Sequence, residues 1–112
     1  MYLGLDLGTS GLKGILLTKD QEVVGVAESN YSVQNRRTGW SEQDPSDWIY
    51  ACENVMLSLS NQFPSQILEL RGIGISGQMH GAVLLEKNGN VIRPCMLWND
   101  TRSYTQAQKM DE

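Results

Sequence analysis

The segment from Asp6 to Lys13 is the first in which the residue types could do chemistry. It reads Asp6-Leu7-Gly8-Thr9-Ser10-Gly11-Leu12-Lys13. A carboxylate precedes a tight turn rich in glycine and hydroxyl groups, and such a turn can point backbone N–H groups and hydroxyls at a phosphate. The P-loop pattern GxxxxGK[ST] is absent. Because Asp6 stands among leucines, an unpaired carboxylate would be costly there, and a hydrated Mg²⁺ would offset that cost. The alternative is an ordinary hairpin turn in which backbone amides bind Asp6.

A second candidate is the loop Gly77-Gln78-Met79-His80-Gly81, which contains the only histidine of the chain. The flanking glycines favour an exposed loop that a ligand can approach closely. Gln78 and His80 would supply polar contacts in a small-molecule site, and Met79 an apolar one. The alternative is a structural histidine.

The third candidate is the run Leu97-Trp98-Asn99-Asp100-Thr101-Arg102. An exposed Trp98 beside amide, carboxylate and guanidinium groups suits a pocket for a polyol. The alternative is that Asp100 caps a helix and Trp98 lies in the core.

The glycines of Gly72-x-Gly74-x-x-Gly77 match the dinucleotide-binding fingerprint by spacing. That fingerprint must follow a strand and open a helix. Here the glycines lie inside an apparent strand and lead into another, so we interpret them as positions where the backbone approaches a neighbouring element or a ligand.

The elements that must position these segments begin with three strands. Residues 2–7, 12–17 and 22–29 are mainly apolar and are separated by turn residues, which predicts an antiparallel meander. The first strand, apolar except for Gly4 and Asp6, is expected to be buried on both faces.

A helix should follow the polar loop 30–44, with Asp44 as N-cap and Pro45 at its first position. Its core stripe, at helical spacing, is Trp48, Ile49, Cys52, Val55, Met56 and Leu59. Residues 70–76 predict a buried strand, and Asn88-Gly89 predicts a hairpin between 82–86 and 91–93. A last helix should occupy residues 101–112, capped by Asp100 or Thr101. The predicted fold class is α/β, with a βββα start.

Composition excludes several partner classes. Nine Lys and Arg against 13 Asp and Glu give a net charge of −4, which does not suit nucleic acid or an anionic membrane. We find neither a signal peptide nor an apolar run of membrane length. Cys52 and Cys95 are far apart, so we expect reduced thiols in a cytoplasmic protein rather than a disulfide or zinc site.

Four segments together resemble the FGGY carbohydrate kinases in order and spacing: YLGLDLGTSGLKGILL, GWSEQDP, GISGQMHGAVLL and VIRPCMLWNDTR. The first alone would indicate only the actin-like ATPase superfamily. Within the family, GQMHG together with LWND is similar to the xylulose kinases. The resemblance covers essentially the whole chain, and it implies a ribonuclease-H-like domain whose C-terminal end is incomplete here.

The resemblance also implies a reaction, the transfer of the γ-phosphoryl group of ATP to the 5-hydroxyl of D-xylulose, with ATP and Mg²⁺ as cofactors. Asp6 would hold the Mg²⁺ through water, and the turn that follows it would approach the phosphates. The residues implied on the phosphate side are Gly8, Thr9, Ser10, Gly11 and Lys13. Those implied on the sugar side are Gln78, Met79, His80, Trp98 and Asp100.

Family members are several times longer than 112 residues. Their catalytic base and adenosine-binding elements lie beyond this chain, so residues 1–112 are expected to be the N-terminal part of the first domain and inactive alone. The chain would then pair with the remainder of the protein or form a homodimer. Two alternatives stay open: a kinase for another ketose or polyol, such as ribulose, and a non-catalytic module that binds sugar or phosphate.

Overall fold

The computed structural model describes residues 1–111. The chain divides into two compact units, which are described separately. Unit 1 comprises residues 1–31 and 46–78, and unit 2 comprises residues 32–45 and those from Met79 onward. Unit 1 therefore contains the predicted phosphate turn, and unit 2 contains most of the residues predicted to contact a sugar.

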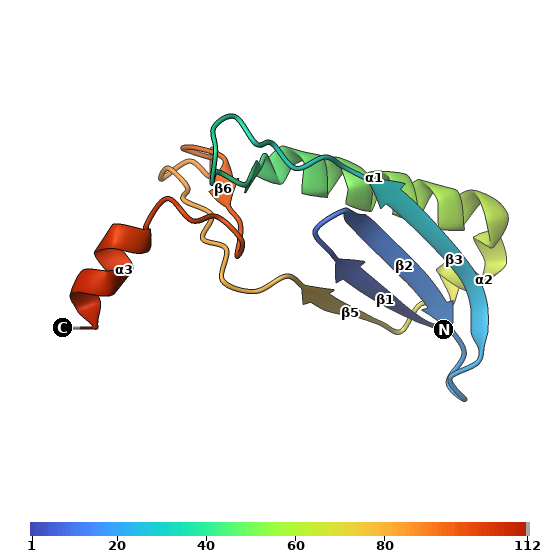
Figure 1. The fold of residues 1–112 in the computed structure, drawn as a ribbon. Helices are drawn as coiled ribbons and strands as arrows, with labels where there is room; N and C mark the ends of the chain where they lie inside the picture. Colours follow the sequence, from blue (N-terminus) through green and yellow to red (C-terminus); the bar gives the residue numbers. More distant parts are fainter. Residues whose placement is uncertain (112) are drawn as a thin grey trace. The chain divides into compact units, whose positions relative to one another are not determined.

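Unit 1 is built on a four-stranded sheet with the order β3-β2-β1-β5 (Figure 1). The strands are β1 (Tyr2–Leu7), β2 (Gly11–Leu17), β3 (Val23–Asn30) and β5 (Gly72–Gly77). The first three form the antiparallel meander that the sequence predicts, and β5 pairs with β1 in parallel. Helix α1 (Pro45–Gln62) and the short helix α2 (Pro64–Leu68) complete the unit, so the predicted βββα start is confirmed.

Helix α1 packs on one face of β1, β2 and β3 (Figure 1). The residues that form this core are Leu3, Leu5, Leu12, Ala27, Ala51, Val55 and Leu59. A Cβ on Gly14 would lie 2.4 Å from Cγ1 of Val55, so glycine is needed at this position for the helix to approach the sheet. Four residues of the predicted helical stripe lie in or against this core: Cys52, Val55, Met56 and Leu59. Ile49 is exposed and Trp48 is only half-buried, while Ala51 is buried in the core.

Two predictions about burial were wrong. In β1, Leu3 and Leu5 face the core, but Asp6 is exposed, because successive side chains of a strand point to opposite faces. In β5, Ile73 and Ile75 remain 56% and 79% exposed. Helix α1 covers β1 to β3, whereas β5 lies at the edge of the sheet.

Unit 2 contains a two-stranded sheet that the sequence analysis missed. Strand β4 (Glu42–Gln43), inside the predicted polar loop, pairs antiparallel with β6 (Cys95–Met96). The Asn88–Gly89 turn is present, with Gly89 at φ +89° and its N–H bonded to the Glu86 carbonyl. Its flanks form one bridge, between Leu85 and Val91, instead of the two predicted strands.

The last helix, α3 (Tyr104–Met110), begins three residues later than predicted. Its N-cap is Ser103, without a side-chain capping bond, so the predicted cap of Asp100 or Thr101 was wrong. The carboxylate of Asp100 binds Arg102 and Ser41 instead, and the Thr101 hydroxyl donates to the Gly39 carbonyl. The predicted end of this helix, at residue 112, lies outside the described residues.

Candidate functional site

The turn from Gly8 to Gly11 joins β1 to β2 and is tightly held. The N–H of Gly8 donates to the Gly11 carbonyl at 3.0 Å, which closes the turn. A Cβ on Gly11 would lie 2.7 Å from Oδ1 of Asn30 and 2.8 Å from the Ser29 carbonyl oxygen, so a larger residue would push strand β3 away. Gly8, Thr9, Ser10 and Gly11 therefore form a compact turn with a restrained backbone, as binding of a phosphate through backbone N–H groups requires.

Tyr31, the residue after β3, binds this turn at two points. Its hydroxyl donates to the Gly8 carbonyl at 2.6 Å, and its N–H donates to the Ser10 carbonyl at 3.1 Å. Burial, together with the nearby negative charge of Asp6, raises the pKa of Tyr31 to about 12, so the hydroxyl remains a donor at neutral pH. The sequence analysis missed Tyr31, because nothing near it in the sequence marks it as a partner of residues 8–10.

Asp6 lies on the exposed face of β1. Its register partners are Lys13 on β2 and Ser76 on β5. Because Asp6 is exposed, burial of its carboxylate is not the reason to expect a metal there. The carboxylate nevertheless accepts no hydrogen bond and makes no ion pair within residues 1–111. Mg²⁺ keeps several waters and is commonly bound by one or two carboxylates together with substrate phosphates. A lone carboxylate two residues before the turn fits that donor set.

Lys13 forms an ion pair on the face of the sheet. Its Nζ lies 3.0 Å from Oε1 of Glu28, its register partner on β3. Both side chains are about half exposed, so this ion pair is weak. Lys13 therefore lies in the row that also holds Asp6, and it would have to leave Glu28 to reach a phosphate.

Gln78 belongs to unit 1 and contacts the turn Gly8–Gly11, whereas the other residues predicted to contact a sugar belong to unit 2. Its Oε1 accepts a hydrogen bond from Oγ1 of Thr9 at 3.3 Å, and its N–H donates to the Leu7 carbonyl at 2.9 Å. Both contacts lie within unit 1. The first residue of the Gln78-Met79-His80 run is thus attached directly to the turn.

In unit 2, a pocket of about 290 Å³ brings three predicted residues together: His80, Trp98 and Asp100. The rest of its lining is Ala82, Met96, Leu97 and Ser103. His80 adopts a left-handed backbone conformation at φ +65°, which is uncommon for a residue other than glycine. Met79 is 68% exposed and does not line this pocket.

Asp100 is fully occupied by hydrogen bonds from the protein. Oδ1 accepts from the N–H and Nε of Arg102, at 3.0 and 2.8 Å, and Oδ2 accepts from the Ser41 N–H and from Nη2 of Arg102, at 2.7 and 2.6 Å. A carboxylate offers about four acceptor sites. The Arg102 guanidinium holds the pKa of Asp100 well below its usual range. This geometry favours a role for Asp100 in holding the loop, with Trp98 and His80 facing the pocket.

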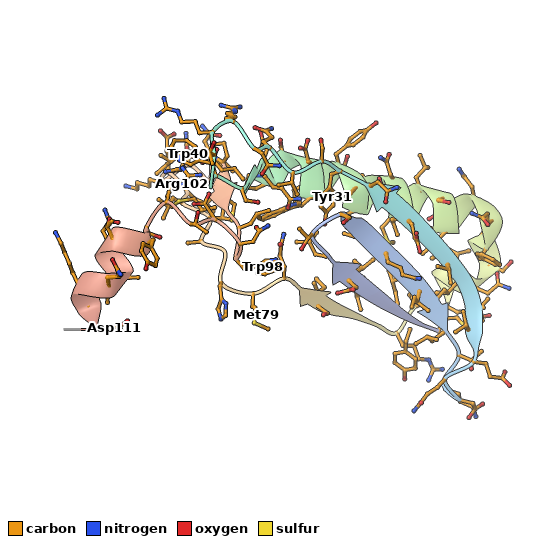
Figure 2. The ribbon with its side chains drawn as sticks, in the orientation of Figure 1. Tyr31, Trp40, Met79, Trp98, Arg102 and Asp111 are labelled. Carbon is orange, nitrogen blue, oxygen red and sulfur yellow. The ribbon has the colours of Figure 1, made fainter. Side chains whose placement is uncertain are left out.

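Arg102 connects Asp100 to a second carboxylate and to an aromatic ring. Its Nη2 lies 2.9 Å from Oε1 of Glu42, which also binds Arg93. Its guanidinium stacks on Trp40, 3.6 Å from the ring centre. Both residues are labelled in Figure 2. The sequence analysis quoted Glu42, Trp40 and Arg93 only within longer motifs and gave them no role, since nothing in the sequence shows that they meet Arg102 or its partners.

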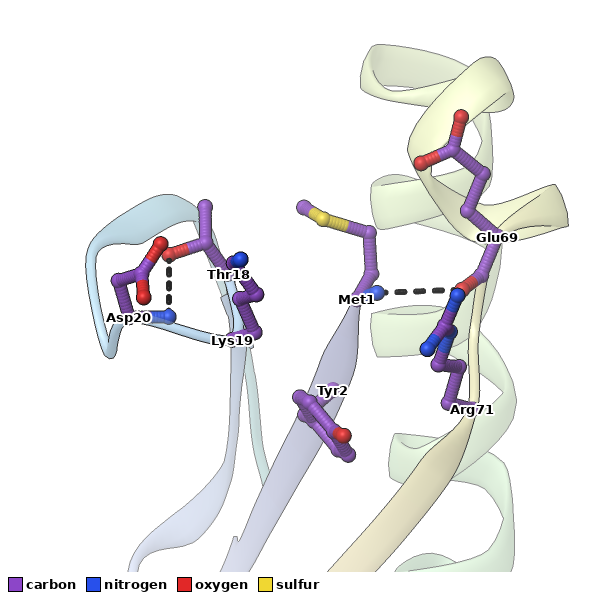
Figure 3. Close-up of a pocket in the computed structure, with 7 residues that line it drawn as sticks. All are labelled: Met1, Tyr2, Thr18, Lys19, Asp20, Glu69 and Arg71. Carbon is purple, nitrogen blue, oxygen red and sulfur yellow. Dashed lines mark hydrogen bonds between the residues drawn. The ribbon is translucent and has the colours of Figure 1, made fainter.

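A further pocket, of about 570 Å³, lies at the other end of the unit 1 sheet (Figure 3). Its lining is Met1, Tyr2, Thr18, Lys19, Asp20, Glu69 and Arg71, none of which the sequence predicted as functional. The N-terminal ammonium donates to the Glu69 carbonyl at 3.1 Å. Because β1 and β2 are antiparallel, this pocket lies at the end of the sheet opposite the turn Gly8–Gly11.

Three further features of residues 1–111 bear on function. Among these residues, no three His, Cys, Asp or Glu side chains come together as possible ligands of a metal ion. Both cysteines are free, and burial raises the pKa of Cys95. None of the helices in this part of the chain has the length and apolar character needed to cross a membrane.

Comparison with known proteins supplies the family. Residues 1–112 match the N-terminal domain of the FGGY family of carbohydrate kinases. The chain is 43% identical to the xylulose kinase of Klebsiella pneumoniae over its whole length, and 46% identical to that of Escherichia coli K12 over 91% of it. It spans 23% and 21% of those two proteins.

The structure superposes on that of a xylulose kinase from Brucella ovis with a TM-score of 0.96 and 51% identity. The match covers 98% of this chain and 23% of that one. The predicted fold, the ribonuclease-H-like fold of the actin-like ATPases, is thereby confirmed. The chain belongs to the FGGY family of carbohydrate kinases, with the N-terminal domain of that family represented in residues 1–112.

Proposed function

We propose that this chain is the N-terminal part of an ATP-dependent kinase that phosphorylates the 5-hydroxyl of D-xylulose. The observation that carries the proposal is the contact between Thr9 and Gln78, 69 positions apart in the sequence. It joins the turn suited to phosphate to the first residue of the loop that leads to His80. The relatives named above are xylulose kinases, which supports D-xylulose as the substrate.

On the phosphate side, the turn would orient the transferred group, and Asp6 would hold a Mg²⁺ through water. The metal would supply neutralisation of the negative charge on the phosphates. Thr9 would add a hydroxyl near the transferred group. Phosphoryl transfer depends on positioning and on electrostatic stabilisation, so a restrained turn with an exposed carboxylate beside it provides the kind of help this reaction needs.

On the sugar side, His80 and Trp98 would contact the substrate. A neutral imidazole can both donate and accept a hydrogen bond, which suits neighbouring sugar hydroxyls. The indole would offer an apolar face and one N–H donor. Asp100 would act by keeping the loop in place through Arg102, and Met79 would contact the sugar only if its exposed side chain turned toward the ligand.

The remainder of the protein would supply the catalytic base and the site for adenosine. The exposed edge strand β5 is one surface on which that remainder, or a second copy of the chain, could pair. Residues 1–112 alone should not turn over substrate. General-base catalysis is typically worth about two to four orders of magnitude, and the nucleotide half of the site would be missing as well.

The test is an assay of ADP release by the full-length protein with Mg-ATP and each of D-xylulose, D-ribulose, gluconate and glycerol. We expect the highest kcat/KM with D-xylulose, and ³¹P NMR should place the phosphate on its 5-hydroxyl. A higher kcat/KM with another sugar or polyol would replace D-xylulose in the proposal. Absence of sugar-dependent ADP release with every substrate would refute the kinase activity and favour a binding module.

A further inference from the structure

Tyr31 is joined to the phosphate turn by two hydrogen bonds from different parts of the residue. The hydroxyl reaches the carbonyl of Gly8 at 2.6 Å, and the backbone N–H reaches the carbonyl of Ser10 at 3.1 Å. These two carbonyls lie on either side of Thr9. One residue therefore restrains the backbone both before and after the side chain that binds Gln78.

The first bond has a consequence through the geometry of the peptide. The Gly8 carbonyl and the Thr9 N–H belong to one planar unit and point in opposite directions. Directing the Gly8 carbonyl toward the Tyr31 hydroxyl therefore fixes the direction of the Thr9 N–H as well. In a turn with glycine at both ends, this restraint matters, because glycine allows backbone angles that other residues rarely adopt.

Tyr31 is itself well anchored. Its side chain is partly buried and packs against the hydrophobic core beneath α1. Its backbone follows directly from β3, whose last residue, Asn30, pairs with Gly11 at the end of the turn. The Tyr31 hydroxyl thus links a rigid core to a turn that carries no large side chain of its own.

We propose that Tyr31 is a positioning residue for phosphoryl transfer, which holds the turn Gly8–Gly11 in the conformation that receives the transferred phosphate. This inference rests on the proposed function. Tyr31 acts through the backbone around Thr9 and contacts neither reactant. It should therefore affect the chemical step and leave binding of the sugar, which involves the loop after Gln78, nearly unchanged.

The test compares Tyr31→Phe with Tyr50→Phe in the full-length protein. Tyr31→Phe keeps the ring in the core and removes the hydroxyl, and Tyr50, exposed on α1, provides the same chemical change away from the turn. For Tyr31→Phe we expect kcat to fall about tenfold at saturating Mg-ATP, with KM for D-xylulose within about threefold of wild type. Tyr50→Phe should change neither value.

Several results would overturn the inference. A kcat within twofold of wild type, with a lower Tm, would make Tyr31 a structural residue only. A raised KM for D-xylulose with unchanged kcat would place its effect on sugar binding.

Tyr31→Met, which fills the space of the ring without a hydroxyl, should reproduce the loss of kcat if the hydroxyl is responsible. A wild-type protein without kinase activity would overturn both this inference and the proposed function, whereas an active wild type beside an unaffected variant would overturn this inference alone.

Discussion

Replacing Arg102 by leucine should loosen the loop that carries Trp98 and Asp100. The guanidinium donates to Asp100 at 2.8 and 2.6 Å and lies 2.9 Å from Glu42. The side chains of these two acids are 3% and 4% exposed, so both carboxylates would stay buried after the cation is removed. Removing one partner of a buried ion pair costs about 3–5 kcal/mol.

The lower end of that range applies here. After the substitution, Glu42 would keep Arg93, and Asp100 would keep the N–H groups of Ser41 and of residue 102. We therefore expect the free energy of local opening to fall by about 3 kcal/mol. The stacking of the guanidinium on Trp40 would also be lost, which acts in the same direction.

Hydrogen exchange with mass-spectrometric detection is the suitable assay, because it reports local opening even in a protein of several domains. The informative amides are those of Ser41, Leu97 and Thr101, which donate to Asp100, to Ser41 and to Gly39. A loss of about 3 kcal/mol predicts exchange roughly 100-fold faster. The control is Arg36→Leu, an exposed arginine outside the network. Exchange within threefold of wild type in Arg102→Leu would show that the network does not hold this loop.

The remaining predictions concern Asp6, His80 and Asp100 in the full-length protein. Asp6→Asn should lower kcat about tenfold to hundredfold with little change in KM for D-xylulose, as steady-state kinetics would show, because it removes a negative charge from the phosphate side. A kcat within a few-fold of wild type would leave Asp6 without a role in catalysis. His80→Ala should weaken D-xylulose binding about tenfold to hundredfold in calorimetric titration and leave Mg-ATP affinity unchanged. A loss of ATP affinity instead would move His80 to the phosphate side. The lowered pKa of Asp100 predicts that protection of the Ser41 amide, present above about pH 4, decreases as the pH falls through the folded-state pKa, and that Asp100→Asn abolishes this dependence. The same acid dependence in Asp100→Asn would assign it to another group.

The parts of the fold that could be predicted from the sequence are those decided by neighbouring residues. Apolar runs separated by turn residues gave the three strands, and Pro45 with the apolar stripe gave α1. The predictions that failed are those of burial, which depends on what covers each strand. Ile75 looks like a core residue from its neighbours, and its exposure follows only from the position of β5 at the edge of the sheet.

The same division applies to the site. Gly8 and Gly11 could be identified because a tight turn requires small residues, and the structure shows how closely Asn30 approaches Gly11. The partners of Asp100 could not be identified, because Ser41 lies 59 positions away and nothing in the sequence links the two. Asp6 was placed in the right strand, but its predicted burial was wrong, since the leucines around it belong to the opposite side of the pleat.

The parallel pairing of β1 and β5 explains why two motifs so far apart in the sequence meet. Leu7 is the register partner of Gly77, so both strands end at the same edge of the sheet. Thr9 lies two residues beyond one strand and Gln78 one residue beyond the other, and their side chains meet there. A shift of one residue in this register would turn the side chains of β5 to the opposite face and separate the pair. The small residues of β5, which resemble a nucleotide fingerprint by spacing, thus belong to a strand that places Gln78 beside the turn that we propose binds phosphate.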